Sequence, residues 1–201
     1  KEFIEDENIS DCLLLGDYSR SIGSLDENRD DIKTIVNTVG DLTNLYGIPG
    51  NCDALETVKI LRSFGIYAHN SAVIIGDYSV VLYGGSNTTP FGTPWELDEQ
   101  VIYDDIAGLI QENPDKRKLL AVHTPPKNTA CDVIPAGVHV GSESVRAVIE
   151  EFKPEIVLCS HIHECAGTVD TVGKTTVINV GMFAEGNVVR VTGKGAEHLK
   201  L

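Results

Sequence analysis

Short apolar runs alternate with segments of helical periodicity along most of this chain. In the longer segments, apolar side chains recur every three or four residues, which predicts helices. The predicted helices span residues 30–46, 55–64, 97–110 and 142–152. The shorter apolar runs predict buried strands. The predicted strands span residues 12–15, 47–49, 119–122 and 156–159.

The remaining apolar runs predict further β-structure. Residues 72–75 and 80–83 flank Gly76-Asp77, an arrangement that predicts a β-hairpin. Three more strand-like runs lie near the C-terminal end, at residues 168–172, 175–180 and 188–192. Strands that alternate with helices predict an α/β fold in which helices cover the sheets. We find no repeat and no linker, so we expect one domain over residues 1–201.

The composition fits a globular domain. With 42% hydrophobic residues, a chain of 201 residues can build a sizeable core. The longest apolar runs are far too short to cross a bilayer, and the acidic first residues do not resemble a signal peptide. The five cysteines are odd in number and share no C-x-x-C spacing, which argues against a disulfide framework. We therefore expect a soluble, cytoplasmic protein.

The formal net charge of −14 limits the classes of partner. It argues against binding to nucleic-acid polymers and to anionic membranes. A small phosphorylated substrate is compatible with this charge, because a bound metal ion would supply positive charge locally.

Potential metal ligands follow four of the predicted strands. Asp17 follows the first strand, Asn51 the second and His123 the third, and the fourth leads into His161 and His163. Sites in open α/β sheets form beyond the carboxyl ends of the strands, so we expect these side chains to converge. In an extended backbone the two imidazoles at i and i+2 would share a face. One carboxylate, one amide and three imidazoles suit Mn, Fe, Zn or Ni better than Ca.

The order of these residues resembles a known family. Gly16-Asp17, Gly50-Asn51-Cys52-Asp53, His123 and Ser160-His161-Ile162-His163 are similar to the motifs of the calcineurin-like metallophosphoesterases. That family reads D-x-H, G-D, G-N-H-D or G-N-C-D, a lone His, and G-H-x-H. Residues 84–91 and 123–126 also resemble a small prokaryotic branch that has the G-N-C-D form. The resemblance covers nearly the whole chain and implies a four-layer αββα sandwich.

The resemblance implies a role for each ligand. Asp17 would bridge two metal ions, while Asn51, His123 and His161 would complete one metal site and His163 would bind the other metal. Mn²⁺ is the favoured ion, with Fe, Ni, Zn and Mg as alternatives. Two metals about 3.5–4 Å apart would activate a shared water, and the resulting hydroxide would attack a phosphodiester or phosphomonoester.

The family's D-x-H motif is missing from residues 1–201. We expect this motif and its strand upstream of Lys1, which would make the chain an N-terminally incomplete domain. Without D-x-H, one metal keeps only His163 and the bridging Asp17, whereas the other site keeps all four of its ligands. For a chain that starts at Lys1, the sequence predicts one well-held metal ion, a weak second site and poor activity.

Cys52 replaces the histidine of G-N-H-D. In the family that histidine stabilises the transition state or protonates the leaving group, and a thiol does neither well near neutral pH. Cys52 is a candidate substrate contact, but we favour the interpretation that it only fills space. Asp53 would then support the metal ligands without binding metal itself.

Two further residues leave a choice open. Gly40-Asp41 also matches the G-D motif, but it lies within a predicted helix close to Asn51, so Asp17 is preferred. His139 precedes a predicted helix N-terminus, where free N–H groups can bind phosphate. We consider His139 as a substrate contact, and a solvent-facing loop histidine is an equal alternative.

The leading hypothesis is a metal-dependent phosphoesterase that acts on a small phosphorylated substrate. The alternative is a non-catalytic scaffold or binding protein on the same fold with a degenerate metal site. The retromer complex contains a scaffold protein of this kind. A nuclease of the same superfamily is disfavoured by the net charge. A homo-oligomer is compatible with the sequence.

Overall fold

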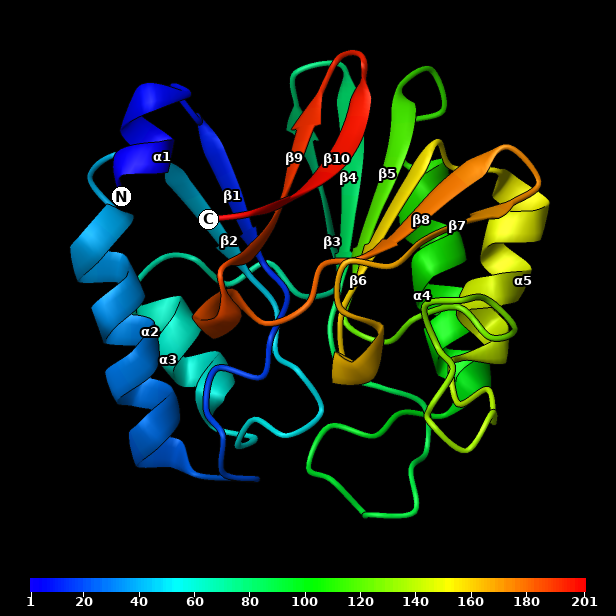
Figure 1. The fold of residues 1–201 in the computed structure, drawn as a ribbon, viewed down its shortest axis with the longest axis horizontal. Coiled ribbons are helices and arrows are strands. Elements are labelled where there is room, and N and C mark those ends of the chain that lie inside the picture. Colours follow the sequence, from blue (N-terminus) through cyan, green and yellow to red (C-terminus); the bar gives the residue numbers. More distant parts are fainter.

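The computed structural model describes residues 1–201, whose strands form two facing β-layers (Figure 1). The larger layer is a six-stranded sheet with the order β3-β4-β5-β6-β8-β7. Its strands are β3 (Ser71–Ile75), β4 (Tyr78–Tyr83), β5 (Arg117–Val122), β6 (Ile156–Cys159), β7 (Val169–Val172) and β8 (Thr175–Asn179). The four inner strands are parallel, whereas the edge strands β3 and β7 are antiparallel to their neighbours.

The smaller layer consists of two strand pairs. β1 (Asp11–Leu14) pairs in parallel with β2 (Asn44–Gly47), and β9 (Asn187–Thr192) pairs antiparallel with β10 (Gly195–Lys200). The inner parallel strands of both layers end at one edge of the sandwich, which is the lower edge in Figure 1. The loops that carry the predicted ligands therefore meet there.

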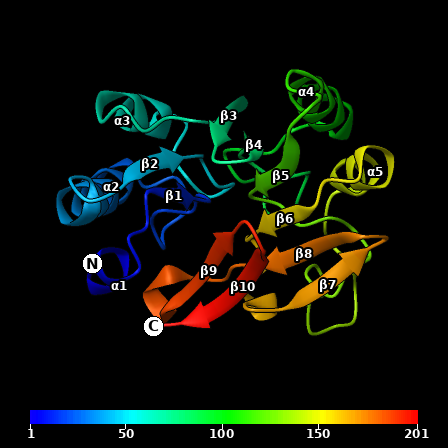
Figure 2. The ribbon, with the colours of Figure 1, turned by 90° about the horizontal axis from the view of Figure 1, so that it is seen from above.

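Helices cover the outer faces of both layers (Figure 2). α2 (Leu25–Val39) and α3 (Thr57–Ser63) lie on the side of β1 and β2, whereas α4 (Glu99–Gln111) and α5 (Glu143–Phe152) cover the six-stranded sheet. Short helices occupy Glu2–Asp6 (α1), His163–Cys165 and Phe183–Glu185. No helix in the structure combines the length and the hydrophobicity that crossing a membrane requires.

Three hydrophobic clusters separate the four layers. One cluster packs α2 and α3 against β1 and β2 through residues such as Ile32 and Leu61. A second fills the space between the two β-layers through residues such as Leu82. The third packs α4 and α5 onto the six-stranded sheet through residues such as Ile106 and Val148. These clusters confirm the αββα sandwich.

Most predicted elements are present, with three corrections. The helix predicted over residues 30–46 is wrong at both ends, because α2 begins at Leu25 and ends at Val39. Residues 44–47 instead form β2, which pairs with β1, so the strand predicted over residues 47–49 is wrong in its bounds as well. β10 was not predicted, because its residues are half-buried or exposed and lack a strong apolar run.

One buried hydroxyl in the fold yields a stability prediction. The Tyr18 side chain packs against the cluster under α2 and α3, and its hydroxyl is buried without a hydrogen-bond partner. Since an unsatisfied buried polar group is costly, we expect Tyr18→Phe to raise the free energy of unfolding by about 1 kcal/mol. In the matched control, Tyr83→Phe removes a 2.8 Å bond to Asp105 and should lower the free energy of unfolding. Urea denaturation measures both changes, and a destabilised Tyr18→Phe would contradict the prediction.

Candidate metal centre

Asp17 reaches the strand ends through an unusual backbone turn. β1 ends at Leu14, and both Gly16 (φ 87°) and Asp17 (φ 54°) adopt left-handed conformations. This turn presses Gly16 against the loop after β2, where an added Cβ would lie 2.1 Å from the backbone nitrogen of Gly50. The close approach of the two loops places Asp17 beside the segment that carries Asn51.

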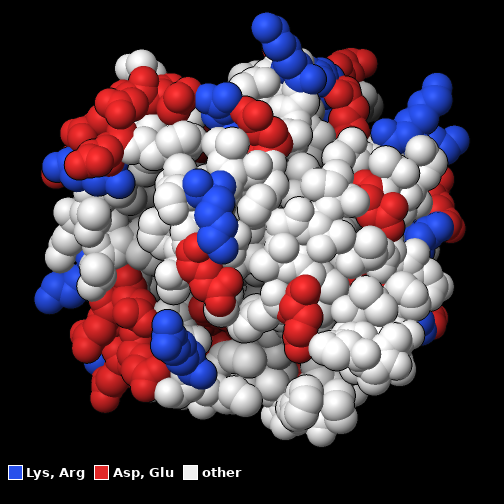
Figure 3. Space-filling view, in the orientation of Figure 1, with Lys and Arg blue, Asp and Glu red and all other residues white.

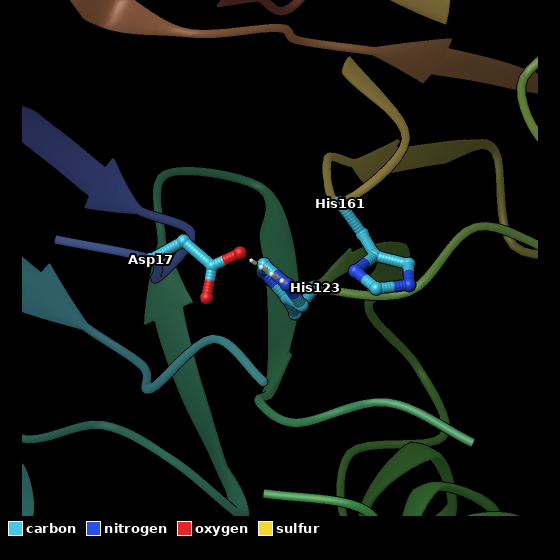
Figure 4. A group of neighbouring side chains, drawn as sticks. All are labelled: Asp17, His123 and His161. Atoms are coloured by element: carbon cyan, nitrogen blue, oxygen red, sulfur yellow. Dashed lines mark ion pairs between the residues drawn. The ribbon is translucent and has the colours of Figure 1, made fainter. Parts of the chain in front are cut away.

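The side chains of four predicted ligands meet at this edge. The Nε2 atom of His123 lies 3.3 Å from Oδ2 of Asp17 and 3.0 Å from Oδ1 of Asn51. The same Asn51 oxygen lies 2.8 Å from Nδ1 of His161. Figure 4 shows Asp17, His123 and His161 directed toward one another from separate segments of the chain. Each of these three offers a ligand atom within 4.8 Å of the other two.

The tautomer of His123 is set by the backbone. Its ring is fully buried, and Nδ1 lies 2.6 Å from the carbonyl oxygen of Leu15. A carbonyl can only accept, so Nδ1 carries a hydrogen and Nε2 of the neutral ring carries a lone pair. That lone pair faces the oxygens of Asp17 and Asn51, which are acceptors as well. Facing acceptors require a cation between them. Without a metal ion that cation is a proton on Nε2, because burial is outweighed by Asp17 and the Leu15 carbonyl, which raise the pKa of His123. A divalent transition metal, which suits this mixed oxygen and nitrogen donor set, would replace that proton.

The local electrostatics favour the metal-binding forms of two ligands. Burial alone would raise the pKa of Asp17, but His123 and the N–H of Cys52 outweigh it and lower the pKa to about 2. Burial, together with the charge of His123, lowers the pKa of His161 to about 3. Near neutral pH the carboxylate of Asp17 is therefore ionised, and the imidazole of His161 is neutral.

Asp53 fastens the two ligand loops to each other. It is fully buried and accepts hydrogen bonds from the backbone N–H groups of Asp17 (2.9 Å), Tyr18 (2.9 Å) and Gly50 (2.7 Å). Burial first, and the charge of Asp17 second, raise the pKa of Asp53 to about 6. These contacts are with the backbone that carries the ligands, as the supporting role proposed for this residue requires.

Sequence reasoning missed Asn28, which lies on α2 and is fully buried. Its amide donates to Asp53 (2.7 Å), and its oxygen accepts from the N–H of Ala54 and the hydroxyl of Thr57. Asn28 precedes the buried Ile32 by one helical turn, so the helical spacing places it on the apolar face of α2. A polar residue on that face indicates a buried hydrogen-bonding role.

The loop that carries His161 is not extended. β6 ends at Cys159, and His161 adopts a left-handed φ of 66° that non-glycine residues rarely occupy. The buried Asn179 holds this loop by donating to the carbonyls of Ser160 (3.1 Å) and Ile162 (3.0 Å). The prediction that an extended backbone aligns the two imidazoles is therefore wrong, because the strand ends before them. Asn179 was missed as well, although a polar residue at the end of an apolar strand marks it.

His163 lies apart from the four converging ligands. It begins a short 3₁₀-helix and is exposed, and it does not belong to the group formed by Asp17, His123 and His161. Its assignment to a second metal therefore stays a prediction. Asp41 is exposed in the turn after α2 and is also outside this group, so the structure brings Asp17 rather than Asp41 to the candidate site.

The two candidate substrate contacts differ in their surroundings. The backbone N–H of Cys52 donates to Oδ1 of Asp17 (2.9 Å). Burial, followed by the charges of Asp17 and Asp53, raises the pKa of the Cys52 thiol to about 12, so it is protonated near neutral pH. His139 makes a 2.6 Å contact through Nδ1 with the buried Asp132 and keeps a partly exposed ring.

The fold and the ligand group together are those of a metallophosphoesterase. A family model described as calcineurin-like phosphoesterase matches residues 1–165. The chain therefore belongs to the calcineurin-like phosphoesterase family, whose members bind divalent metals and hydrolyse phosphoesters.

Similar proteins add the fold but no specific activity. The uncharacterized protein MJ1162 of Methanocaldococcus jannaschii is 37% identical over 145 residues, which cover 70% of this chain and 65% of that protein. The chain thus spans just under two thirds of this relative's length. A crystal structure of TT1561 of Thermus thermophilus superposes with a TM-score of 0.72 at 16% identity, covering 99% of this chain and 89% of that one. Another solved structure gives a TM-score of 0.78 at 17% identity, with coverages of 99% and 91%.

Proposed function

We propose that this protein is a metal-dependent phosphoesterase that hydrolyses a small phosphodiester or phosphomonoester, with Mn²⁺ as the favoured ion. One observation carries the proposal: Asp17, Asn51, His123 and His161 bring oxygen and nitrogen atoms that can bind a metal into contacts of 2.8–3.3 Å with one another. When bound, the metal polarises a phosphoryl oxygen and lowers the pKa of a water molecule.

The protein's own residues prepare this chemistry. Asp17 supplies the negative charge of the ligand group, and Asn51, His123 and His161 supply neutral donors. The hydrogen bond to the Leu15 carbonyl keeps the Nε2 lone pair of His123 directed at the metal position. His163 is proposed as a ligand of a second, weaker site, and residues 1–201 should therefore hold one Mn²⁺ tightly.

His139 is proposed as a contact to the substrate. Asp132 orients its ring through Nδ1, which leaves Nε2 free to face a ligand. Asp132 is itself fixed, because it is fully buried and accepts from the backbone N–H groups of Thr129 and Gly141. A supported imidazole of this kind can donate a hydrogen bond to a phosphate oxygen.

Hydrolysis of two chromogenic esters tests the proposal. Bis(4-nitrophenyl) phosphate and 4-nitrophenyl phosphate are offered with Mn²⁺, Fe²⁺, Zn²⁺, Ni²⁺ or Mg²⁺, and a calorimetric titration counts the Mn²⁺ bound. We expect turnover with Mn²⁺ and one tight site per chain. Lack of turnover with every metal would contradict the proposed phosphoesterase activity. Two tight sites would contradict the predicted number of bound metal ions.

Cys52 leads to a prediction about the leaving group. Since its thiol stays protonated and weakly acidic, we expect Cys52→Ser to retain wild-type turnover of nitrophenyl esters. A positioned general acid contributes about 10²–10⁴-fold. Cys52→His should therefore raise kcat for an alkyl phosphodiester more than for a nitrophenyl one, because only the alkoxide needs a proton. Steady-state kinetics on both esters measure this ratio, and a large loss in Cys52→Ser would show that the thiol takes part.

Two observations favour the scaffold alternative. His163 is exposed outside the ligand group, and Cys52 cannot act as an acid, so two features of a full catalytic centre are weak here. A scaffold would bind Mn²⁺ without turning over either ester.

A nuclease is disfavoured by the charge of −14. In Figure 3 the lysines and arginines on the visible face lie singly among acidic groups and form no basic groove. The five free cysteines are compatible with the predicted cytoplasm.

A further inference from the structure

The amide of Asn51 must present its oxygen, and not its nitrogen, to a metal ion. Its Oδ1 atom faces His123 and His161, while its Nδ2 atom lies 3.0 Å from Oγ1 of Thr93. Asn51 and Thr93 are only 3% and 7% exposed, so solvent does not decide this orientation. The contact with Thr93 is therefore the feature that distinguishes the two ends of the amide.

The hydroxyl of Thr93 has a single hydrogen, and it donates this hydrogen to a carboxylate. Oγ1 lies 2.9 Å from Oε1 of Glu96, which can only accept. The hydrogen of Thr93 therefore goes to Glu96, and its oxygen is left as an acceptor. The group that faces this oxygen must be the NH₂ of Asn51, which turns Oδ1 toward the imidazoles.

Glu96 is held as an anion by its own loop. Oε1 also accepts from the hydroxyl of Thr89 (2.6 Å) and from the N–H of Thr93 (2.7 Å). Thr89 contributes most to lowering the pKa of Glu96 to about 2. The base of the loop is fastened to Asn51 as well, because the N–H of Trp95 donates to the Asn51 carbonyl (3.1 Å). The chain of hydrogen bonds therefore has a fixed direction near neutral pH.

We propose that Thr93 and Glu96 are positioning residues that fix the amide of Asn51 as an oxygen donor to the metal. The Asn51 NH₂ donates to the Thr93 hydroxyl, which in turn donates to the Glu96 carboxylate. This chain of hydrogen bonds also increases the electron density on Oδ1, which strengthens it as a ligand. The proposal rests on the proposed metal-dependent function. It adds that the loop with Thr93 and Glu96, which contributes no metal ligand, is needed to orient Asn51.

Two substitutions at Thr93 test the proposal through metal binding. Thr93→Val keeps the shape but removes the hydroxyl, and Thr93→Ser keeps the hydroxyl. We expect Mn²⁺ to bind Thr93→Val about 10–100-fold more weakly, as for other residues that support metal ligands, and Thr93→Ser to resemble the wild type. Electron paramagnetic resonance of free Mn²⁺ gives the affinities, and the visible spectrum of bound Co²⁺ should change in Thr93→Val alone. A Thr93→Val protein with wild-type affinity and spectrum would overturn the proposal.

Glu96→Ala provides a second variant if Thr93→Val does not fold. Alanine has no oxygen that can accept from the Thr93 hydroxyl, which frees the Thr93 hydrogen to face Asn51 and lets the Asn51 amide turn over. We again expect weaker Mn²⁺ binding, and unchanged binding would overturn the proposal.

A metal-free measurement separates this proposal from the proposed function. In the apo protein, the side-chain amide resonances of Asn51 should shift in Thr93→Val and stay in place in Thr93→Ser. A wild-type protein that binds no metal contradicts the proposed function, and in that case the Asn51 resonances still decide whether Thr93 orients the amide. Resonances that do not respond to Thr93→Val overturn the positioning role.

Discussion

Replacing Asp17 with asparagine is expected to abolish tight Mn²⁺ binding and to lower kcat/KM for a phosphodiester by at least about 100-fold. Residues that only support metal ligands cost about 10–100-fold when removed, so a direct ligand should cost more. Asp17 supplies the only carboxylate among the four converging ligands. Asparagine has nearly the same shape, and its oxygen can still accept from the N–H of Cys52, so the fold should survive. Calorimetry with Mn²⁺ and steady-state kinetics measure the two losses.

The chain offers a matched control for this substitution. Gly40-Asp41 is the other Gly-Asp pair that resembles the family motif, and Asp41 is exposed in the turn after α2. Asp41→Asn removes the same charge from the whole molecule but leaves the ligand group intact. We expect wild-type affinity and turnover for Asp41→Asn. Equal losses in both variants would mean that net charge, rather than coordination by Asp17, governs metal binding.

The sandwich could be predicted because its layers are encoded by local patterns. β4 and β6 are continuous buried runs and α5 has a clear apolar face, so each was predicted close to its observed limits. The prediction failed where pairing overrode periodicity: Leu42 continues the helical spacing of α2, yet the chain has already left the helix at Val39. Pairing between β1 and β2 is a long-range contact that no local pattern reveals.

The convergence of Asp17, Asn51, His123 and His161 could be predicted, but the groups that orient them were missed. Asp17, Asn51 and His123 each follow an apolar strand, and strand ends of parallel sheets meet at one edge. Asn28, Asn179 and Thr93 act through hydrogen bonds to segments far away in sequence. The local pattern marks Asn28 and Asn179 as polar residues among apolar ones, but it does not reveal which distant segments they hold. Thr93 is of a residue type common in polar loops and has no such mark.

Gly50 is expected to be as sensitive to substitution as a ligand, although it binds nothing through a side chain. An added Cβ would lie 2.1 Å from Oδ1 of Asp17 and 2.3 Å from its backbone nitrogen, distances that no rotamer of alanine can relieve. Gly50→Ala must therefore displace Asp17 or separate the two ligand loops. A misplacement of about 1 Å at a catalytic centre can cost about 10²-fold in rate. We expect a loss of this size in kcat/KM, weaker Mn²⁺ binding, and a loss of about 1–3 kcal/mol in the free energy of unfolding.

Gly108→Ala is the matched control for Gly50→Ala. Gly108 lies on the exposed face of α4, where an added Cβ would meet nothing within 4 Å. Because alanine favours a helix by about 1 kcal/mol over glycine, Gly108→Ala should stabilise the protein and leave Mn²⁺ binding unchanged. Opposite signs of the two stability changes would show that space, and not backbone entropy, determines the effect at Gly50. If Gly50→Ala binds Mn²⁺ with wild-type affinity, the loops after β1 and β2 do not approach as closely as the structure indicates, and the position of Asp17 does not depend on that contact.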